Sequence, residues 1–345
     1  MKARFVLAVA IAAGLAASVA GQAPSPARQA QPRPAAASAG QATAYTPPKT
    51  PWGDPDLQGV WNDATSTPLQ RPTGVKDVLS DEEAADFQAS LAHDLTRDRR
   101  DGGADIDVNR AYNDHWMDAR RLKITSDHRS SLIVDPPDGR FPPAVPQSPE
   151  RQELRAARAA AGARFNAGLP DDHTDMSLPV RCIIRTDSPP YLPTIYNNDF
   201  QIVQSPGIVA IAPEMIHSAR IIPLDGRPHL NKGFNQWLGD SRGHWDGTTL
   251  VIETTNFRTD DTVTFQGTNP ATFKITERLT RVDPTSINYE FTVEDPSTWM
   301  KPWTALIPWT KIDPAEQMYE YACHEDNFDI VHFLTGARNR QKNER

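Results

Sequence analysis

From about residue 194 onward, apolar and polar residues alternate with a period of two, which is typical of β-strands that bury one face. Turn-forming pairs such as Asp225-Gly226 and Asp246-Gly247 separate the alternating runs. The pattern predicts eight strands, at residues 200–205, 208–212, 216–224, 249–255, 273–282, 287–295, 304–310 and 318–324. Sequential hairpins form an antiparallel meander, and closing the meander into a barrel removes its exposed edges. We therefore predict a mainly β fold, with an antiparallel barrel and a C-terminal tail over residues 194–345.

The segment at residues 51–193 shows mixed strand, helix and loop patterns, and we expect it to pack on the barrel. Residues 55–62 predict a short first strand that is preceded by a turn. Residues 131–134 predict a further strand, which closes into a turn rich in proline and aspartate.

Two helices are expected in the same segment. Ser80 and Glu83 have the spacing of a capping box, and apolar residues follow at every fourth position, so the first helix is predicted over residues 81–97. Ser148-Pro149 starts the second helix, which is expected to end before Gly168. We expect the arginine-rich face of this second helix to be solvated.

The first twenty residues have the pattern of a secretory signal peptide. Basic residues precede the apolar run at residues 5–20, which ends in Ser18-Val19-Ala20, the small-x-small form of a cleavage site. Residues 21–50 are rich in Ala, Pro, Gln and Ser, and this composition predicts a disordered leader. We therefore expect a periplasmic or secreted protein without stable membrane insertion. A retained membrane anchor is the alternative.

Export changes the interpretation of the two cysteines, Cys182 and Cys323. In an oxidising compartment a lone pair usually forms one disulfide. Closing a loop of about 140 residues would stabilise the fold by roughly 5 kcal/mol on the chain-entropy model. Two free buried thiols are one alternative, and a metal site at residues 323–326 is another. Strand alternation would place Cys323 and His324 on opposite faces, which disfavours the metal site.

Composition and charge narrow the class of function. The 31 prolines and 19 glycines disfavour a helical bundle. The net charge of −8 disfavours nucleic acid and anionic membrane surfaces as partners. The sequence contains no phosphate-binding glycine loop, dinucleotide fingerprint, nucleophile elbow or His-Glu-x-x-His motif. We therefore expect no cofactor and no metal, and a homodimer is left open.

Glu277 is the most informative candidate for chemistry. Alternation places it on the same strand face as Ile275 and Leu279, so its carboxylate is expected to point inward. A carboxylate in an apolar cavity can act as an acid or base at neutral pH. The alternative is a buried structural ion pair between Glu277 and an arginine such as Arg220 or Arg242.

Asp295 is the expected partner of Glu277. Pairing Leu279 opposite Phe291 would set Glu277 opposite Val293, with Asp295 on the adjacent diagonal at roughly 7–8 Å. The two inward carboxylates would then have separated pKa values, which suits one acid and one base.

A second group of polar residues lies within residues 214–244, on one hairpin and the loop after it. Its histidines are natural proton carriers near neutral pH, although one histidine in a strand is more often a hydrogen-bonded structural residue. The three histidines lack a compact metal-ligand spacing. Together with Glu277 and Asp295, the candidate catalytic residues are Glu214, His217, Arg220 and Arg242.

Aromatic residues form a third feature. Trp303, Ala305, Ile307 and Trp309 alternate onto one strand face. Buried indoles still need partners for their N–H groups, so they can either line a pocket for a flat apolar ligand or simply fill the core. The candidate ligand-binding residues are Tyr196, Trp237, Trp299, Trp303, Tyr319 and His324.

Several motifs carry a resemblance to a known family. They are Pro55–Trp61, Ser131–Arg140, Glu214–His229, Trp237–Trp245, Tyr289–Pro296 and Tyr319–Glu325. These segments resemble a large family of exported bacterial proteins, frequent in acidobacteria and sphingomonads, most of which have no assigned reaction. The match covers nearly everything after Pro51. Separately, Gly59-Val60-Trp61 ahead of a meander resembles the lipocalin or calycin signature, and the long insertion between Asn62 and Thr194 departs from a compact lipocalin.

These observations lead to one functional expectation with two rivals. The first hypothesis is a cofactor-free acid–base enzyme, a lyase or isomerase, that acts on a hydrophobic and aromatic small molecule in a barrel cavity. The first rival is a non-catalytic, lipocalin-like carrier of a hydrophobic ligand. The second rival is a structural protein of the cell envelope.

Overall fold

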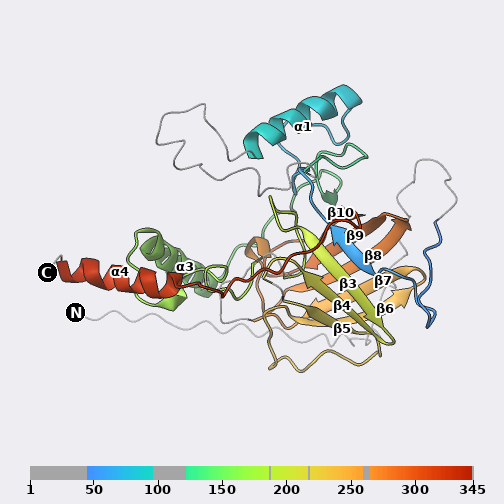
Figure 1. Cartoon of the computed structure of the whole chain (residues 1–345). Helices are drawn as coiled ribbons and strands as arrows, with labels where there is room; N and C mark the ends of the chain where they lie inside the picture. The colour runs from blue at the N-terminus through green and yellow to red at the C-terminus, as the bar shows by residue number, and fades with distance from the viewer. Residues whose placement is uncertain (1–44, 96–121, 186–187, 217, 259–264, 344–345) are drawn as a thin grey trace, which may run out of the picture. The chain divides into compact units, whose positions relative to one another are not determined.

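The computed structural model describes residues 45–95, 122–185, 188–216, 218–258 and 265–343 (Figure 1). The predicted signal peptide and residues 21–44 of the predicted leader lie outside the described residues. Among the described residues, no helix has the length and apolar character needed to cross a bilayer.

A nearly closed antiparallel barrel forms the body of the protein, as the alternation predicts (Figure 1). Its strands are β1 (Gly59–Asn62), β3 (Asp199–Ser205), β4 (Ile208–Pro213), β5 (Arg220–Pro223), β6 (Asp240–Asp246), β7 (Thr249–Thr255), β8 (Lys274–Asp283), β9 (Ser286–Glu294) and β10 (Trp303–Lys311). They pair in the order β5-β4-β3-β1-β10-β9-β8-β7-β6, and β2 (Ile133–Asp135) pairs with β10 outside this path. The mainly β fold class is therefore confirmed.

The two end strands, β5 and β6, meet at a seam where Gly243 is essential. A Cβ atom at Gly243 would lie 2.8 Å from the Cγ2 atom of Ile222 on β5 and 2.7 Å from a methyl group of Leu224. Both distances are too short for real carbon atoms, so only glycine lets the strands approach this closely. The glycine at the seam thus allows the sheet to curl back on itself.

Two parts of the strand prediction are wrong. Residues 240–246 form strand β6, which the pattern hides because the inward positions Ser241 and Gly243 are small and carry no apolar signal. Residues 318–324 form turns and coil instead of the predicted last strand. Both edges of β10 are already paired, with β1 and β9, so no edge of β10 is open to a following strand.

Both predicted helices form. Helix α1 (Asp81–Leu95) begins with the expected capping box, in which the backbone N–H of Ser80 donates to the carboxylate of Glu83 at 3.0 Å. Helix α3 (Pro149–Asn166) is capped by the Ser148 hydroxyl, which accepts from the N–H of Arg151. A third helix, α4 (Asp329–Asn343), is not predicted from the sequence pattern. It packs on α3 through Phe333 and Phe165, whose ring centroids are 4.8 Å apart.

Aromatic side chains fill the interior of the barrel. The predicted inner face of β10 is confirmed, because Trp303, Ala305, Ile307 and Trp309 are all fully buried. Trp309 stacks on Phe200 of β3 at 4.8 Å and lies 4.7 Å from Tyr289 of β9. These rings lie on β3, β10 and β9, which are close together in the strand order, and pack together on the inner face of the sheet, so this part of the interior is a packed aromatic core.

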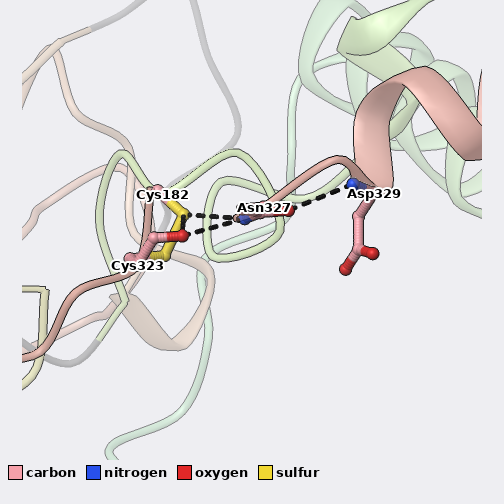
Figure 2. Close-up of a disulfide and its surroundings, with 4 residues drawn as sticks. All are labelled: Cys182, Cys323, Asn327 and Asp329. Atoms are coloured by element: carbon pink, nitrogen blue, oxygen red, sulfur yellow. Dashed lines mark hydrogen bonds between the residues drawn. A yellow bond between two sulfur atoms is a disulfide. The ribbon is translucent and has the colours of Figure 1, made fainter. Parts of the chain in front are cut away.

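The predicted disulfide joins Cys182, in the segment between α3 and β3, to Cys323, in the segment between β10 and α4 (Figure 2). Asn327 donates from its side-chain amide to the carbonyl oxygen of Cys323 at 3.0 Å. The side-chain oxygen of Asn327 in turn accepts from the backbone N–H of Asp329, the first residue of α4, at 3.2 Å. The disulfide is therefore linked directly to the start of the C-terminal helix.

Candidate functional site

Glu277 lies inside the barrel, as predicted, and is fully buried. Its two carboxylate oxygens accept from the two terminal nitrogens of Arg220, at 2.6 and 3.0 Å. The Tyr289 hydroxyl donates to one of the same oxygens at 2.8 Å. Three strands bring these groups together, because Arg220 is on β5, Glu277 on β8 and Tyr289 on β9.

Burial and the neighbouring charges shift the pKa values of Arg220 and Tyr289. Burial lowers the pKa of Arg220, but the charge and hydrogen bonds of Glu277 together with the nearby Tyr191 and Tyr289 raise it more, so the net pKa of the guanidinium rises above its ordinary value. Burial and the charge of Glu277 both raise the pKa of Tyr289 well above its usual range, so its phenol stays protonated and donates. Arg220 also lies 5.0 Å from the centre of the Tyr191 ring. The predicted alternative, a buried ion pair with Arg220, is the arrangement observed.

Asp295 does not join Glu277, because the predicted register between the two strands is wrong. Glu277 pairs with Phe291 and Leu279 with Tyr289, which is a shift of two residues from the expected pairing. The register shifts by one residue between Arg281 and Asp283, next to the turn of this hairpin.

Asp295 lies just beyond the end of β9, where it organises a turn. Its carboxylate accepts from the Thr272 hydroxyl and from the backbone N–H of Asn269, both at 2.6 Å. Burial raises the pKa of Asp295, but the hydrogen bonds from Thr272 and its neighbours lower it more. Asp295 is therefore held as a carboxylate by local donors, separate from the barrel interior.

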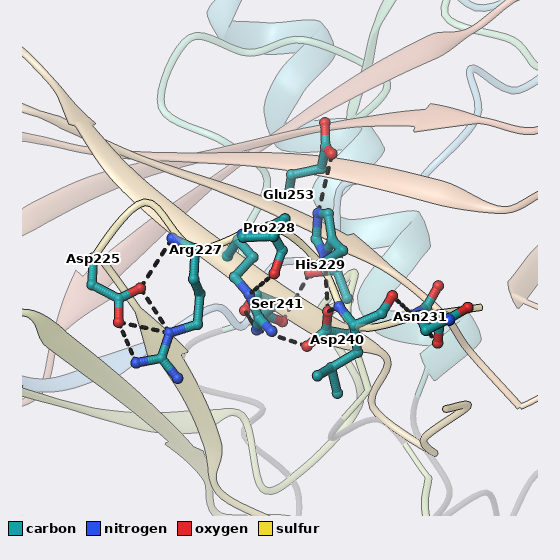
Figure 3. A network of polar contacts seen from close by, with 12 residues as sticks. Asp225, Arg227, Pro228, His229, Asn231, Asp240, Ser241 and Glu253 are labelled. Atoms are coloured by element: carbon teal, nitrogen blue, oxygen red, sulfur yellow. Dashed lines mark hydrogen bonds and ion pairs between the residues drawn. The ribbon is translucent and has the colours of Figure 1, made fainter. Parts of the chain in front are cut away.

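The second polar group forms a cluster around His229 (Figure 3). The ring nitrogens of His229 lie 3.1 Å from Asp240 on β6 and 3.1 Å from Glu253 on β7. A neutral imidazole has one N–H, so only the protonated ring donates to both carboxylates. Arg242 also binds Asp240, at 2.7 Å. Each ring nitrogen of His229 therefore has a carboxylate partner. These contacts hold the segment that contains His229 against strands β6 and β7.

The remaining candidate catalytic residues do not converge. Glu214 is buried, and its carboxylate accepts from the backbone N–H of Tyr319 at 3.4 Å. Arg220 instead faces Glu277 in the barrel. His217 lies outside the described residues.

The candidate ligand-binding residues are also dispersed. Trp303 is part of the barrel core, whereas Tyr319 is 73% exposed and His324 is exposed. Trp299 stacks on Phe141 with ring centroids 4.9 Å apart. Trp237 is covered by the guanidinium of Arg258, and Tyr196 accepts a hydrogen bond from Arg185. Among the residues that the structure describes, a cavity beside α3 contains none of these six side chains, and a small pocket contains Trp237 alone of them.

A cavity of about 980 Å³ lies between helix α3 and lining residues from two described stretches, 174–185 and 188–192. Apolar groups dominate its wall: Leu154, Ala157, Ala161, Phe165, Met176, Leu178, Ile184, Pro189, Pro190, Leu192 and Phe265. Phe265 also stacks on Trp303, at a centroid distance of 5.9 Å, so the cavity adjoins the aromatic core of the barrel.

The wall of this cavity is held in place by polar links. Arg164 of α3 donates from Nε to Asp175 at 2.9 Å, and the same pair makes a second hydrogen bond. The hydrogen bonds from Arg164 hold the pKa of Asp175 below its ordinary value. Cys182, between the lining residues Leu178 and Ile184, anchors the opposite wall through the disulfide.

The sequence interpretation missed this cavity. The sequence predicts a solvated arginine-rich face on α3, but Arg158 and Arg164 line the cavity beside Leu154, Ala157, Ala161 and Phe165, the apolar positions of the same wall. The pattern of the segment after α3 indicates a loop, and the partners of α3 include Phe333, which lies 168 residues after Phe165 (333 − 165 = 168). The weak signal was the helical spacing of those four apolar positions.

Among the described residues, no group of three or more His, Cys, Asp or Glu side chains is arranged to hold a metal ion. Comparisons with protein families, with curated proteins and with solved structures give no match to this chain, so the interpretation of the site rests on its own geometry.

Proposed function

We propose that the protein binds a hydrophobic, flat small molecule in the cavity beside α3 and acts as an exported, non-catalytic carrier. One observation carries this proposal: none of the 18 residues of α3 is buried, and its apolar face lines the cavity. An amphipathic helix gains most of its stability by covering an apolar face. A ligand in the cavity would supply that cover.

The cavity has the properties of a small-molecule site. Its volume of about 980 Å³ falls at the upper end of the range for ligand pockets. Its wall is mainly apolar, and Phe265 and Phe165 offer aromatic surfaces to a flat ligand.

The acid–base hypothesis has less support from the geometry. Both carboxylate oxygens of Glu277 accept hydrogen bonds from Arg220, and one also accepts from Tyr289. The charge of the carboxylate is therefore paired with the guanidinium inside the barrel. Neither Glu277 nor Arg220 lines the cavity beside α3. A carrier needs only the cavity, so the carrier is the function that we propose.

Location outside the cytoplasm is part of the proposal. The signal-like N-terminal sequence and the Cys182–Cys323 disulfide both support it, because disulfides persist in oxidising compartments.

The test uses N-phenyl-1-naphthylamine, a neutral apolar fluorophore, and the mature protein. We expect saturable binding at one site per chain. The variant Ala161→Trp places an indole inside the cavity and should weaken binding at least tenfold. Ala163→Trp is the matched control, because Ala163 is on the same helix, exposed and outside the cavity wall, and it should bind as the wild type does. Absence of saturable binding to the wild type, or equal binding to both variants, would overturn the proposal.

A further inference from the structure

We infer that the outer face of strands β3, β4 and β5 binds the same face of a second copy of the chain, which makes the protein a twofold symmetric dimer. The three strands are neighbours in the barrel wall (Figure 1). This inference goes beyond the proposed carrier function, and it does not depend on a ligand in the α3 cavity.

The outer face of these strands exposes apolar side chains. Val203 on β3 is 48% exposed, Ile208 on β4 is 42% exposed and Ile221 on β5 is 56% exposed. Each of them alternates along its strand with buried residues, so it points away from the barrel interior. Apolar side chains that are grouped and exposed in this way mark a contact site.

The absence of exposed charge separates this face from the rest of the barrel wall. Strands β3, β4 and β5 are described in full, and their two charged residues, Asp199 and Arg220, are both buried. The outer sides of β6, β7 and β8 instead carry ion pairs: Arg278 with Asp246, and Lys274 with Glu253. The centre of a protein interface is depleted of charge, so the composition of an interface is found on β3, β4 and β5.

The charge of the whole chain favours this face for contact between two copies. Each copy has a net charge of −8, so two copies repel each other. A twofold interface contains the same patch from both copies, so an exposed charge near the axis would meet its own like charge. The uncharged face lets two copies approach without that repulsion.

The size of the side chains also varies across this face. In one row across the strands, Ala210 pairs with Val203 on one side and with Ile221 on the other. Directly paired residues have Cβ atoms roughly 5 Å apart, so the two large side chains stand beside the small one. The row therefore forms a shallow groove above Ala210.

The next row along the same strands has the opposite order of sizes. Ile208 pairs with Ser205 on one side and with Pro223 on the other. These residues are two positions from those of the first row on each strand, so the two rows are adjacent on the same face. In the second row, Ile208 projects between two smaller side chains.

The two rows are complementary to each other. A twofold axis perpendicular to the strands, between the rows, would place each row of one copy over the other row of the second copy. The facing pairs would be Val203 with Ser205, Ala210 with Ile208, and Ile221 with Pro223. Every large side chain then meets a smaller one, and Ile208 of each copy fits the groove above Ala210 of the other. This self-complementarity selects a second copy over a different protein as the partner.

Sedimentation velocity of the mature protein, from low micromolar to several hundred micromolar, tests the dimer. We expect the average mass to rise from that of a monomer to that of a dimer across this range. Val203→Glu would bring two like charges into the interface and should raise the dissociation constant at least tenfold. Val282→Glu is the matched control, because Val282 is exposed on β8, and it should dimerise as the wild type does.

A pair of opposite charges then tests the symmetry. Ala210→Glu and Ile208→Lys should each be monomeric when pure. An equal mixture of the two should form a mixed dimer, because the new glutamate of one chain would face the new lysine of the other. A mixture that stays monomeric would overturn the inferred arrangement.

Two further results would overturn the dimer itself. One is a wild type that remains monomeric at every concentration, which is also the result expected if the predicted leader or a different protein covers the face. The other is equal dimerisation of Val203→Glu and the wild type. The wild-type measurement does not depend on any variant folding, and neither result bears on ligand binding in the α3 cavity.

Discussion

Arg220 and Glu277 form a bidentate ion pair inside the barrel, at 2.6 and 3.0 Å, between strands that are far apart in the sheet. Arg220 is on β5, at one end of the strand order, and Glu277 is on β8, third from the other end. The pair therefore crosses the interior and ties together the two halves of a sheet whose end strands meet only at a seam. Its geometry gives it a structural role in closing the barrel.

Replacing Glu277 by Gln should destabilise the protein severely. The change would leave the Arg220 charge buried without a counter-ion, which costs about 3–5 kcal/mol in other proteins. Urea denaturation followed by tryptophan fluorescence measures this loss. Glu290→Gln, on the outward face of β9, is the control and should change stability by less than about 0.5 kcal/mol.

The double variant Glu277→Leu with Arg220→Met should lose less stability than the sum of its single variants, because it leaves neither charge unpaired. Additive losses would show that the two side chains do not act as a pair.

Adding a side chain at the seam should open the barrel. Gly243→Val would push a Cβ atom into Ile222 and Leu224, where the space is already below van der Waals contact. We expect a loss of about 1–3 kcal/mol, as in other overpacked cores, measured by thermal denaturation. Gly162→Ala, on α3, has no atom within 4 Å of the added methyl group and serves as the control. A Gly243→Val protein with wild-type stability would mean that β5 and β6 do not meet in solution.

Removing the disulfide should lower stability strongly. Cys182 and Cys323 are 141 residues apart, and on the chain-entropy model a loop of this length contributes about 5 kcal/mol. The paired variant Cys182→Ala with Cys323→Ala should show this loss in urea without any reductant. Dithiothreitol should lower the melting temperature of the wild type and leave that of the paired variant unchanged, and a wild type insensitive to reductant under denaturing conditions would contradict the bond.

Acid should weaken the attachment of α3. Hydrogen bonds from Arg164 lower the pKa of Asp175 in the folded protein below its ordinary value of 3.8. A depressed folded-state pKa gives stability that is present above the ordinary pKa and is lost as the pH falls through the folded-state pKa. The stability difference between the wild type and Asp175→Asn should therefore be constant from pH 7 to about pH 5 and shrink below about pH 4.

Thermal denaturation across this pH range measures that difference. Glu153→Gln, on the exposed face of α3, is the control and should follow the wild-type profile. A difference that grows as the pH falls would have the wrong sign for an Asp175 carboxylate held by Arg164.

Features that depend on local order could be predicted from the amino-acid sequence. Alternation of apolar and polar residues identified most barrel strands. It also predicted that Glu277 points inward, because successive side chains on a strand point to opposite faces. The Ser80 capping box and the Ser148-Pro149 start located two helices, because helix ends need nearby side-chain partners for free N–H groups. The two cysteines left one intramolecular pairing available in an oxidising compartment.

Features that depend on contacts between distant parts of the chain became visible in the three-dimensional structure. The alignment of β8 and β9 pairs Glu277 with Phe291, so Asp295 is separated from Glu277 although alternation alone allows them to meet. The partner of Glu277 is Arg220, 57 residues away, and alternation cannot choose it from other arginines. The cavity beside α3 exists because the helix, the disulfide-bound segment and Phe265 meet in space. Burial and pairing are properties of such long-range contacts, and no local period in the sequence encodes which contacts form.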